Sequence, residues 1–216
     1  DRLLVRRSDL VIDELNADGT IRDDGTEAKR SLDLRWKKIP LAGGDLMLWA
    51  SGSSINGQTP ETGLVAEDST GWAVGSVHEI SGDGPWWNRF AVLYGTGPSS
   101  NFRSELIPDE VNTGDPTRQT RIKDSWRFRV LNNTVWEKGP WAVSSLLLLE
   151  ERDFGQQADP GSTWMSAGVR PVYFFTRNFS LALEAGVDHT EQDGGPEGEL
   201  WKFTLAPQLT PSMGFN

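Results

Sequence analysis

The chain has 216 residues and no cysteine, with 31 Asp and Glu against 21 Lys and Arg, so its formal net charge is -10. Such acidity argues against nucleic-acid binding, since no basic excess exists to displace phosphate counterions, and the lack of cysteine excludes disulfides and thiolate metal sites. The length suits one or two domains. Ten Trp against two Tyr suit sugar-stacking surfaces, membrane-interface belts or a large all-β core.

In chain order, the sequence predicts about ten strands joined alternately by short turns and long polar loops. The long loops are expected at about 13–30, 52–68, 96–121, 151–162 and 190–198, where Gly and Pro mark most boundaries. No run approaches the ~20 apolar residues of a transmembrane helix. Tight turns at one side and long loops at the other are typical of an antiparallel transmembrane β-barrel, the fold class we predict.

The predicted strands separate apolar from charged side chains at period two. In residues 31–37, Leu32, Leu34 and Trp36 alternate with Asp33, Arg35 and Lys37. Successive strand side chains point to opposite faces, so the charged set is expected to face a barrel lumen. Applied to the strands at 124–134 and 179–189 as well, the same parity predicts these pore-lining residues: Asp33, Arg35, Lys37, Arg127, Arg129, Glu184 and Asp188.

Tryptophans recur at the strand ends. Trp72, Trp126, Trp164 and Trp201 follow long loops, whereas Trp86 and Trp141 follow short turns. Two aromatic levels are what a barrel needs at its two membrane interfaces. The alternative is a β-sandwich whose core uses Trp.

In the strand at 86–95, the apolar stripe of Trp86, Phe90, Val92 and Tyr94 turns Trp87 and Arg89 inward. An inward Trp beside charges suits stacking on a sugar ring, with charged groups binding the hydroxyls. Two alternatives stay open: Trp87 fills the wall, or the parity is inverted and Trp86 faces inward.

No enzyme signature is present. His78-Glu79 begins like a zinc motif, but Gly82 stands where the second His is required. Residues 14–25 resemble a calcium loop, but Gly25 occupies the position of the bidentate Glu. Glu150 and Glu151 face opposite ways on a strand, so they cannot form an acid/base pair. We expect no catalysis, no metal and no cofactor.

Three stretches are similar to the maltoporin family of sugar-specific outer-membrane porins. They are Gly71-Trp72 through His78, Trp86-Trp87-Asn88-Arg89-Phe90-Ala91-Val92-Leu93-Tyr94, and Trp164 to Thr204. The segment Gly168-Val169-Arg170-Pro171-Val172-Tyr173 is the most specific. The likeness covers roughly residues 31–95 and 124–210, and is weak in residues 1–30 and 96–121.

The resemblance implies a homotrimer of eighteen-stranded barrels in the outer membrane of a Gram-negative bacterium, through which oligosaccharides diffuse passively. Each pore would have a constriction loop, an aromatic slide and an ionic track. Trp87 matches a slide position, and Phe215 is the nearest match to a last slide aromatic, although Asn216 competes for that position and would depart from the pattern. About ten strands are too few for such a barrel, because open edges in lipid leave backbone groups unsatisfied. The chain is therefore expected to form a single partial barrel domain over residues 1–216, the central portion of a longer porin whose constriction loop lies outside it.

Two other functions compete with a sugar-selective porin. The first is a secreted all-β carbohydrate-binding domain or jelly-roll glycosidase, which should be soluble without detergent. A glycosidase would also need two carboxylates at catalytic spacing, which we cannot assemble. The second is a non-specific porin, in which Trp87 would have no role in sugar binding.

Overall fold

The protein is represented by a computed structural model, which describes residues 3–15, 21–55, 68–81, 84–102, 121–156 and 161–209. For residues 3–15 and 21–29 only the backbone is described. Within these ranges, no helix is long and apolar enough to cross a membrane.

The described chain consists of strands and two short 3-10 turns. The elements are β1 (Leu3–Leu15), β2 (Ile21–Leu41), β3 (Gly44–Ile55), β4 (Ser69–Ile80), β5 (Trp86–Thr96), η1 (Gly97–Ser99), η3 (Ile122–Asp124), β6 (Trp126–Lys138), β7 (Trp141–Asp153), β8 (Gly161–Phe174), β9 (Phe179–Gln192) and β10 (Glu197–Leu209).

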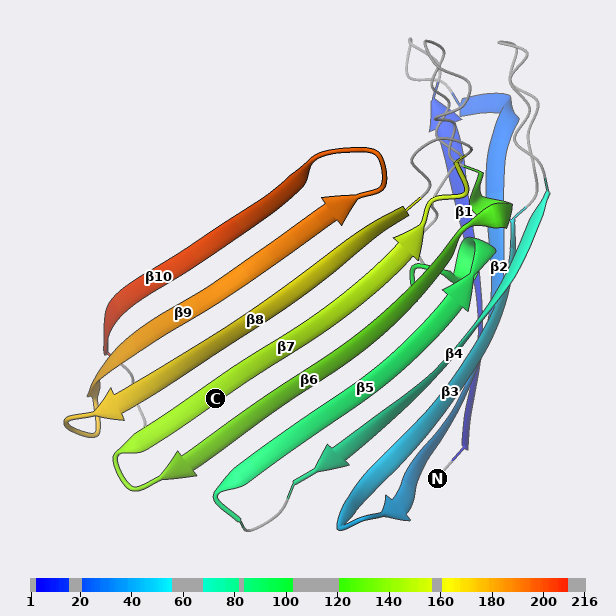
Figure 1. The fold of residues 1–216 in the computed structure, drawn as a ribbon. Coiled ribbons are helices and arrows are strands. Elements are labelled where there is room, and N and C mark those ends of the chain that lie inside the picture. Colours follow the sequence, from blue (N-terminus) through cyan, green and yellow to red (C-terminus); the bar gives the residue numbers. More distant parts are fainter. Residues whose placement is uncertain are drawn as a thin grey trace.

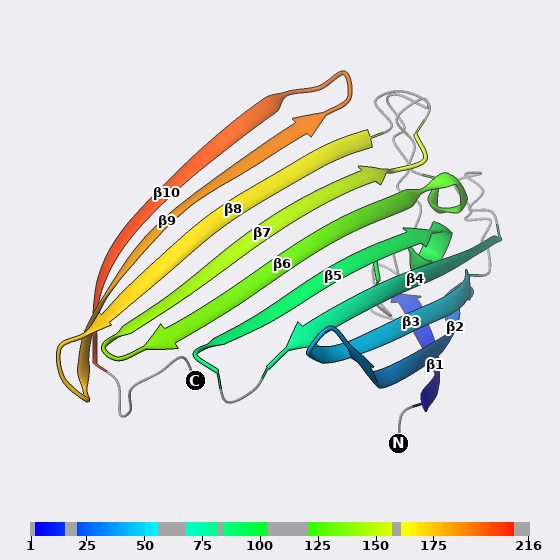
Figure 2. The same cartoon turned by 60° about the horizontal axis from the view of Figure 1, so that its bottom comes forward.

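All ten strands form one sheet in sequence order, and each pairs with its chain neighbours in antiparallel register. The sheet is strongly curved, and β1 to β3 turn away from the plane of β6 to β9 (Figures 1 and 2). β1 and β10 form its two edges among the described residues. The predicted all-β class, an antiparallel wall of about ten strands, is confirmed.

Residues directly opposite each other in the register share a face of the sheet. We call the inner face the one that carries Asp33, Trp49, Arg89, Glu150 and Asp188, and the outer face the other. Buried side chains gather on the inner face, among them Ala73, Ala91, Ala142, Glu150, Val172, Ser180 and Ala182. Most exposed large apolar side chains lie on the outer face, including Leu32, Leu34, Phe90, Leu147, Leu183 and Phe203.

Aromatic side chains cluster at both ends of the outer face. At the long-loop end, Tyr94 lies between Trp72 and Trp126, with ring centroids 5.5 and 6.2 Å apart. At the short-turn end, Trp141 and Tyr173 meet edge to face at 4.8 Å. Two aromatic levels were predicted, and the structure has them.

One predicted loop is wrong. Residues 13–30 were expected to form a polar loop, but β1 continues to Leu15 and β2 begins at Ile21. The register pairs Ile12 with Glu27 and Asp13 with Thr26. A β-ladder is held by backbone hydrogen bonds, so strands continue through residues that carry no apolar stripe. The other four predicted loops fall between strands, with shifted ends.

Candidate functional site

Trp87 lies on the inner face near the start of β5, opposite Val135 of β6. The guanidinium carbon of Arg89 is 5.1 Å from the Trp87 ring centroid, within range of a cation–π contact. Arg89 in turn donates to Glu79 Oε2 from Nε at 3.0 Å and from Nη2 at 2.6 Å. A depression of about 520 Å³ at this end of the sheet is lined by residues of both faces, among them Trp86, Trp87, Val135 and Glu137. Trp87 and Arg89 therefore form an aromatic and charged pair beside a hollow.

A second aromatic and charged group lies on β2 and β3. Asp33 accepts from Arg35 Nε at 2.7 Å and from Trp49 Nε1 at 2.5 Å. Trp49 faces inward over Gly75, where an added Cβ would lie 3.1 Å from the indole. Lys37 falls in the bulge between Trp36 and Ile39, where the register shifts, so the alternation that groups it with Asp33 and Arg35 does not continue through it.

The segment that follows β5 folds back over the inner face. Ser99 and Ser53 hydroxyls meet at 2.7 Å, and the Gly97 N–H donates to the Ser125 carbonyl at 2.8 Å. Beyond η1, the Phe102 ring packs edge to face against Trp49 at 6.3 Å. The guanidinium carbon of Arg129 lies 5.6 Å from the centroid of the same Phe102 ring. Phe102, a loop residue, thus lies between the Trp49 ring of β3 and the Arg129 guanidinium of β6.

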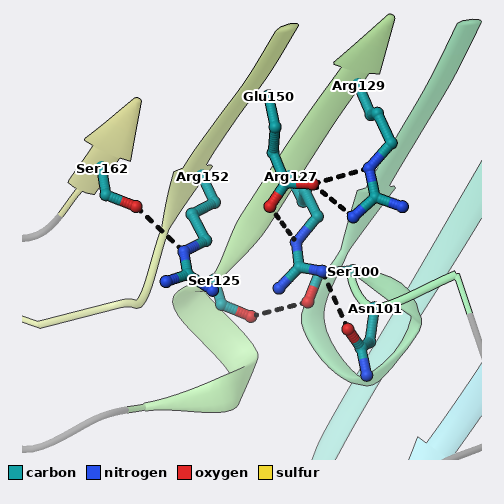
Figure 3. Close-up of polar contacts among 8 residues, drawn as sticks. All are labelled: Ser100, Asn101, Ser125, Arg127, Arg129, Glu150, Arg152 and Ser162. Atoms are coloured by element: carbon teal, nitrogen blue, oxygen red, sulfur yellow. Dashed lines mark hydrogen bonds and ion pairs between the residues drawn. The ribbon is translucent and has the colours of Figure 1, made fainter. Parts of the chain in front are cut away.

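Arg127, Arg129 and Glu150 form an ion-pair cluster on β6 and β7 (Figure 3). Glu150 is only 4% exposed. It accepts from Arg129 Nε at 2.6 Å and lies 3.6 Å from Arg127 Nε. Arg127 also donates to Asn101, which ties the cluster to the segment after η1. The burial of this carboxylate requires both arginines, because an unpaired buried charge is costly.

Arg152 extends the cluster toward β8. Its Nε donates to Ser162 at 2.9 Å, and its guanidinium lies 4.2 Å from the Phe154 ring centroid. The inner face at the long-loop end therefore carries three guanidinium groups around Glu150.

Two further predicted residues lie on β9. Glu184 accepts from Lys202 Nζ of β10 at 2.5 Å. Asp188 accepts from the indole N–H of Trp164 at 3.2 Å. This contact corrects the assignment of Trp164 to the outer aromatic level: the register opposes Trp164 to Glu150, so the ring lies on the inner face.

Phe215, predicted to bind substrate, lies outside the described residues. Within them, no group of three His, Cys, Asp or Glu side chains is placed to hold a metal ion. The pairing of Glu150 and Glu151 as an acid and a base fails as predicted, since their strand partners are Arg129 and Phe128 on opposite faces.

The sequence reasoning missed several inner-face residues: Trp49, Phe102, Glu150, Arg152 and Trp164. The alternation of residues in this strand would have predicted the inner face for Trp164. Ser166 and Arg170 share its parity, whereas the apolar Met165 and Val169 have the opposite parity. For Phe102 no such signal exists, because it lies in no strand.

Chemically, the inner face combines aromatic rings with hydrogen-bonding charges of both signs. Aromatic rings bind apolar surfaces, and ionised groups make strong hydrogen bonds to hydroxyls. Such a surface suits polyhydroxylated ligands that have an apolar face, which is the chemistry of sugars.

The comparison with protein families agrees with this chemistry. The model of the LamB porin family matches residues 3–216, essentially the whole chain. LamB porins are outer-membrane channels for sugars rather than enzymes, and the antiparallel sheet with an apolar outer face is the architecture that such a channel requires. The chain belongs to the LamB porin family.

Proposed function

We propose that the protein is an oligosaccharide-selective porin of a Gram-negative outer membrane, through which sugars pass by passive diffusion. The functional form in this proposal is a homotrimer. The inner face is the pore wall in this proposal. Its lining includes charged residues predicted from parity, namely Asp33, Arg35, Arg127, Arg129, Glu184 and Asp188, whereas Lys37 falls in the bulge of β2.

The observation that carries the proposal is the position of Trp87. Its ring shares the inner face with Arg89 and Glu79, which are hydrogen-bonded to each other. A sugar ring would stack its apolar face on Trp87, while Arg89 and Glu79 exchange hydrogen bonds with its hydroxyls. Phe215 is proposed as a further slide residue on the resemblance alone.

Replacing Trp87 by Ala in the full-length protein should weaken sugar binding about tenfold. Stacking on an aromatic side chain is worth roughly 1–3 kcal/mol for a nucleic-acid base, and a sugar, which has no π-face, should fall near the lower end. One decade in affinity corresponds to about 1.4 kcal/mol. The measurement is the concentration of maltodextrin that half-blocks the ion current in a planar bilayer.

Trp86→Ala is the matched control, since Trp86 is the neighbouring residue on the outer face opposite Trp136. It should leave the sugar block unchanged. A loss of block in Trp86→Ala with the block kept in Trp87→Ala would mean that the faces are inverted. If both variants kept the wild-type block, Trp87 would have no role in sugar binding, and an unblocked wild-type channel would indicate a non-specific porin.

A further inference from the structure

Trp164 is a large apolar side chain that lies on the charged face of the sheet. It is 38% exposed, although most exposed large apolar side chains of the described residues are on the outer face. An aromatic ring exposed on the outer face is explained by lipid. On the inner face of the sheet, lipid does not contact the ring, so lipid does not account for the exposure of Trp164.

The ring is held in one orientation. Its indole N–H donates to Asp188 Oδ1 of β9 at 3.2 Å, and its strand neighbours in the register are Glu150 of β7 and Thr190 of β9. Because its N–H edge is bound to β9 and more than a third of its surface is exposed, part of the indole is open to a ligand. A fixed ring also loses less conformational freedom when a ligand binds.

Polar groups flank the ring on both sides. Asp188 lies on β9, and Glu150 with Arg129 lies on β7 and β6. Glu150 is buried and its oxygens are held by Arg127 and Arg129, so it orients these guanidinium groups and does not itself face a ligand. The acceptor open to a ligand is Asp188, and the partly exposed Arg129 is a donor, which is the combination that neutral sugar hydroxyls require. A purely apolar ligand would gain nothing from these charges.

The Trp164 site is distinct from the Trp87 site. Trp87 lies opposite Val135 of β6, and Val135 lies opposite Ser144 of β7. Trp164 lies opposite Glu150, which is also on β7. Ser144 and Glu150 are six residues apart along β7, which at about 3.3 Å per residue is roughly 20 Å. The two residues also lie three strands apart, on β5 and β8, so a long oligosaccharide that occupies both sites runs obliquely across the pore wall.

We propose that Trp164, with Asp188 beside it, forms a second sugar-binding subsite at the long-loop end of the pore wall. It takes one pyranose ring of a neutral oligosaccharide, stacked on the indole. This inference rests on the proposed function, since it assumes that the inner face meets the transported sugar.

The test is maltodextrin block of the ion current through the full-length protein in a planar bilayer. Trp164→Ala should raise the half-blocking concentration of a long maltodextrin about tenfold, the effect of one lost stacking contact. Trp164→Phe, which keeps an aromatic face and loses the N–H donor, should retain most of the affinity. In the Trp87→Ala/Trp164→Ala double variant the two losses should multiply, because separated sites act independently.

Trp201→Ala is the matched control, because Trp201 is an exposed Trp at the same end of the sheet on the outer face. It should leave the block unchanged. If Trp164→Ala does not assemble, Trp164→Leu keeps the apolar bulk without the flat ring and should show the same loss.

A wild-type block that survives in Trp164→Ala, or in Trp164→Leu, would overturn the subsite while leaving the porin function intact. An equal loss in Trp201→Ala would also overturn it, since the effect would then come from the barrel and not from the inner face. A wild-type channel that no maltodextrin blocks would instead count against the proposed function.

Discussion

Glu150 and Glu151 are adjacent in β7, yet they lie in opposite environments. Glu150 is buried between Arg127 and Arg129 on the inner face, whereas Glu151 is exposed on the outer one. The difference follows from the two-residue period of a strand. At the residue scale, this parity decides which carboxylate is part of an ion-pair network and which is solvated.

Glu150→Ala should destabilise the protein by roughly 3 kcal/mol, the lower end of the range for breaking a buried ion pair. The substitution leaves the guanidinium groups of Arg127 and Arg129 without their shared carboxylate. Glu151→Ala, one residue further on, should change stability by less than about 0.5 kcal/mol, as exposed substitutions usually do. Urea unfolding in lipid vesicles measures both, and equal losses would show that the cluster contributes nothing specific.

At the scale of the elements, two glycines determine how closely η1 packs against β4 and β5. A Cβ at Gly71 would lie 2.1 Å from the Thr96 carbonyl oxygen, and one at Gly95 would lie 2.7 Å from the Ser99 carbonyl oxygen. Both contacts are with backbone, which cannot rotate away as a side chain can. These glycines allow the chain after β5 to fold onto the sheet and to bring Phe102 to Trp49.

Gly71→Ala should therefore displace η1 and cost about 1–3 kcal/mol, the usual range for forcing extra atoms into a packed site. Gly52→Ala on β3 is the control, since a Cβ there meets nothing within 4 Å. Thermal unfolding in detergent micelles should show a lower midpoint for the first variant alone. Indistinguishable midpoints would mean that η1 has room to move.

At the scale of the whole molecule, the sheet is open among the described residues. β1 pairs only with β2, and β10 only with β9. In a bilayer, the unpaired backbone groups of an open edge have no water to satisfy them, so only closed barrels are stable there.

Residues 1–216 expressed alone should accordingly form no stable channel in a planar bilayer. The full-length protein should conduct, and should migrate in unheated SDS gels as a trimer that heating dissociates. Comparing the two in the same lipid controls for the membrane. Stable single-channel conductance from a monomer of residues 1–216 would contradict both the open sheet and the proposed trimer.

The period-two pattern was sufficient to predict the fold class, most of the strands and the faces of many of their residues. Leu32, Asp33 and Trp87 show why: in a strand, the side of the sheet on which a residue lies depends only on its parity and on the chemistry of near neighbours. The end of β1 and the start of β2 escaped prediction because a backbone ladder needs no apolar side chains.

The tertiary structure alone decided the contacts between distant segments. Phe102 reaches Trp49 and Arg129 only because η1 folds back over the sheet, and Glu150 gathers Arg127 and Arg129 from the neighbouring strand. Trp164 meets Asp188 through the register of β8 and β9. Local alternation determines which way a side chain points. Strand register and loop path, which depend on interactions across the whole sheet, determine what it meets there.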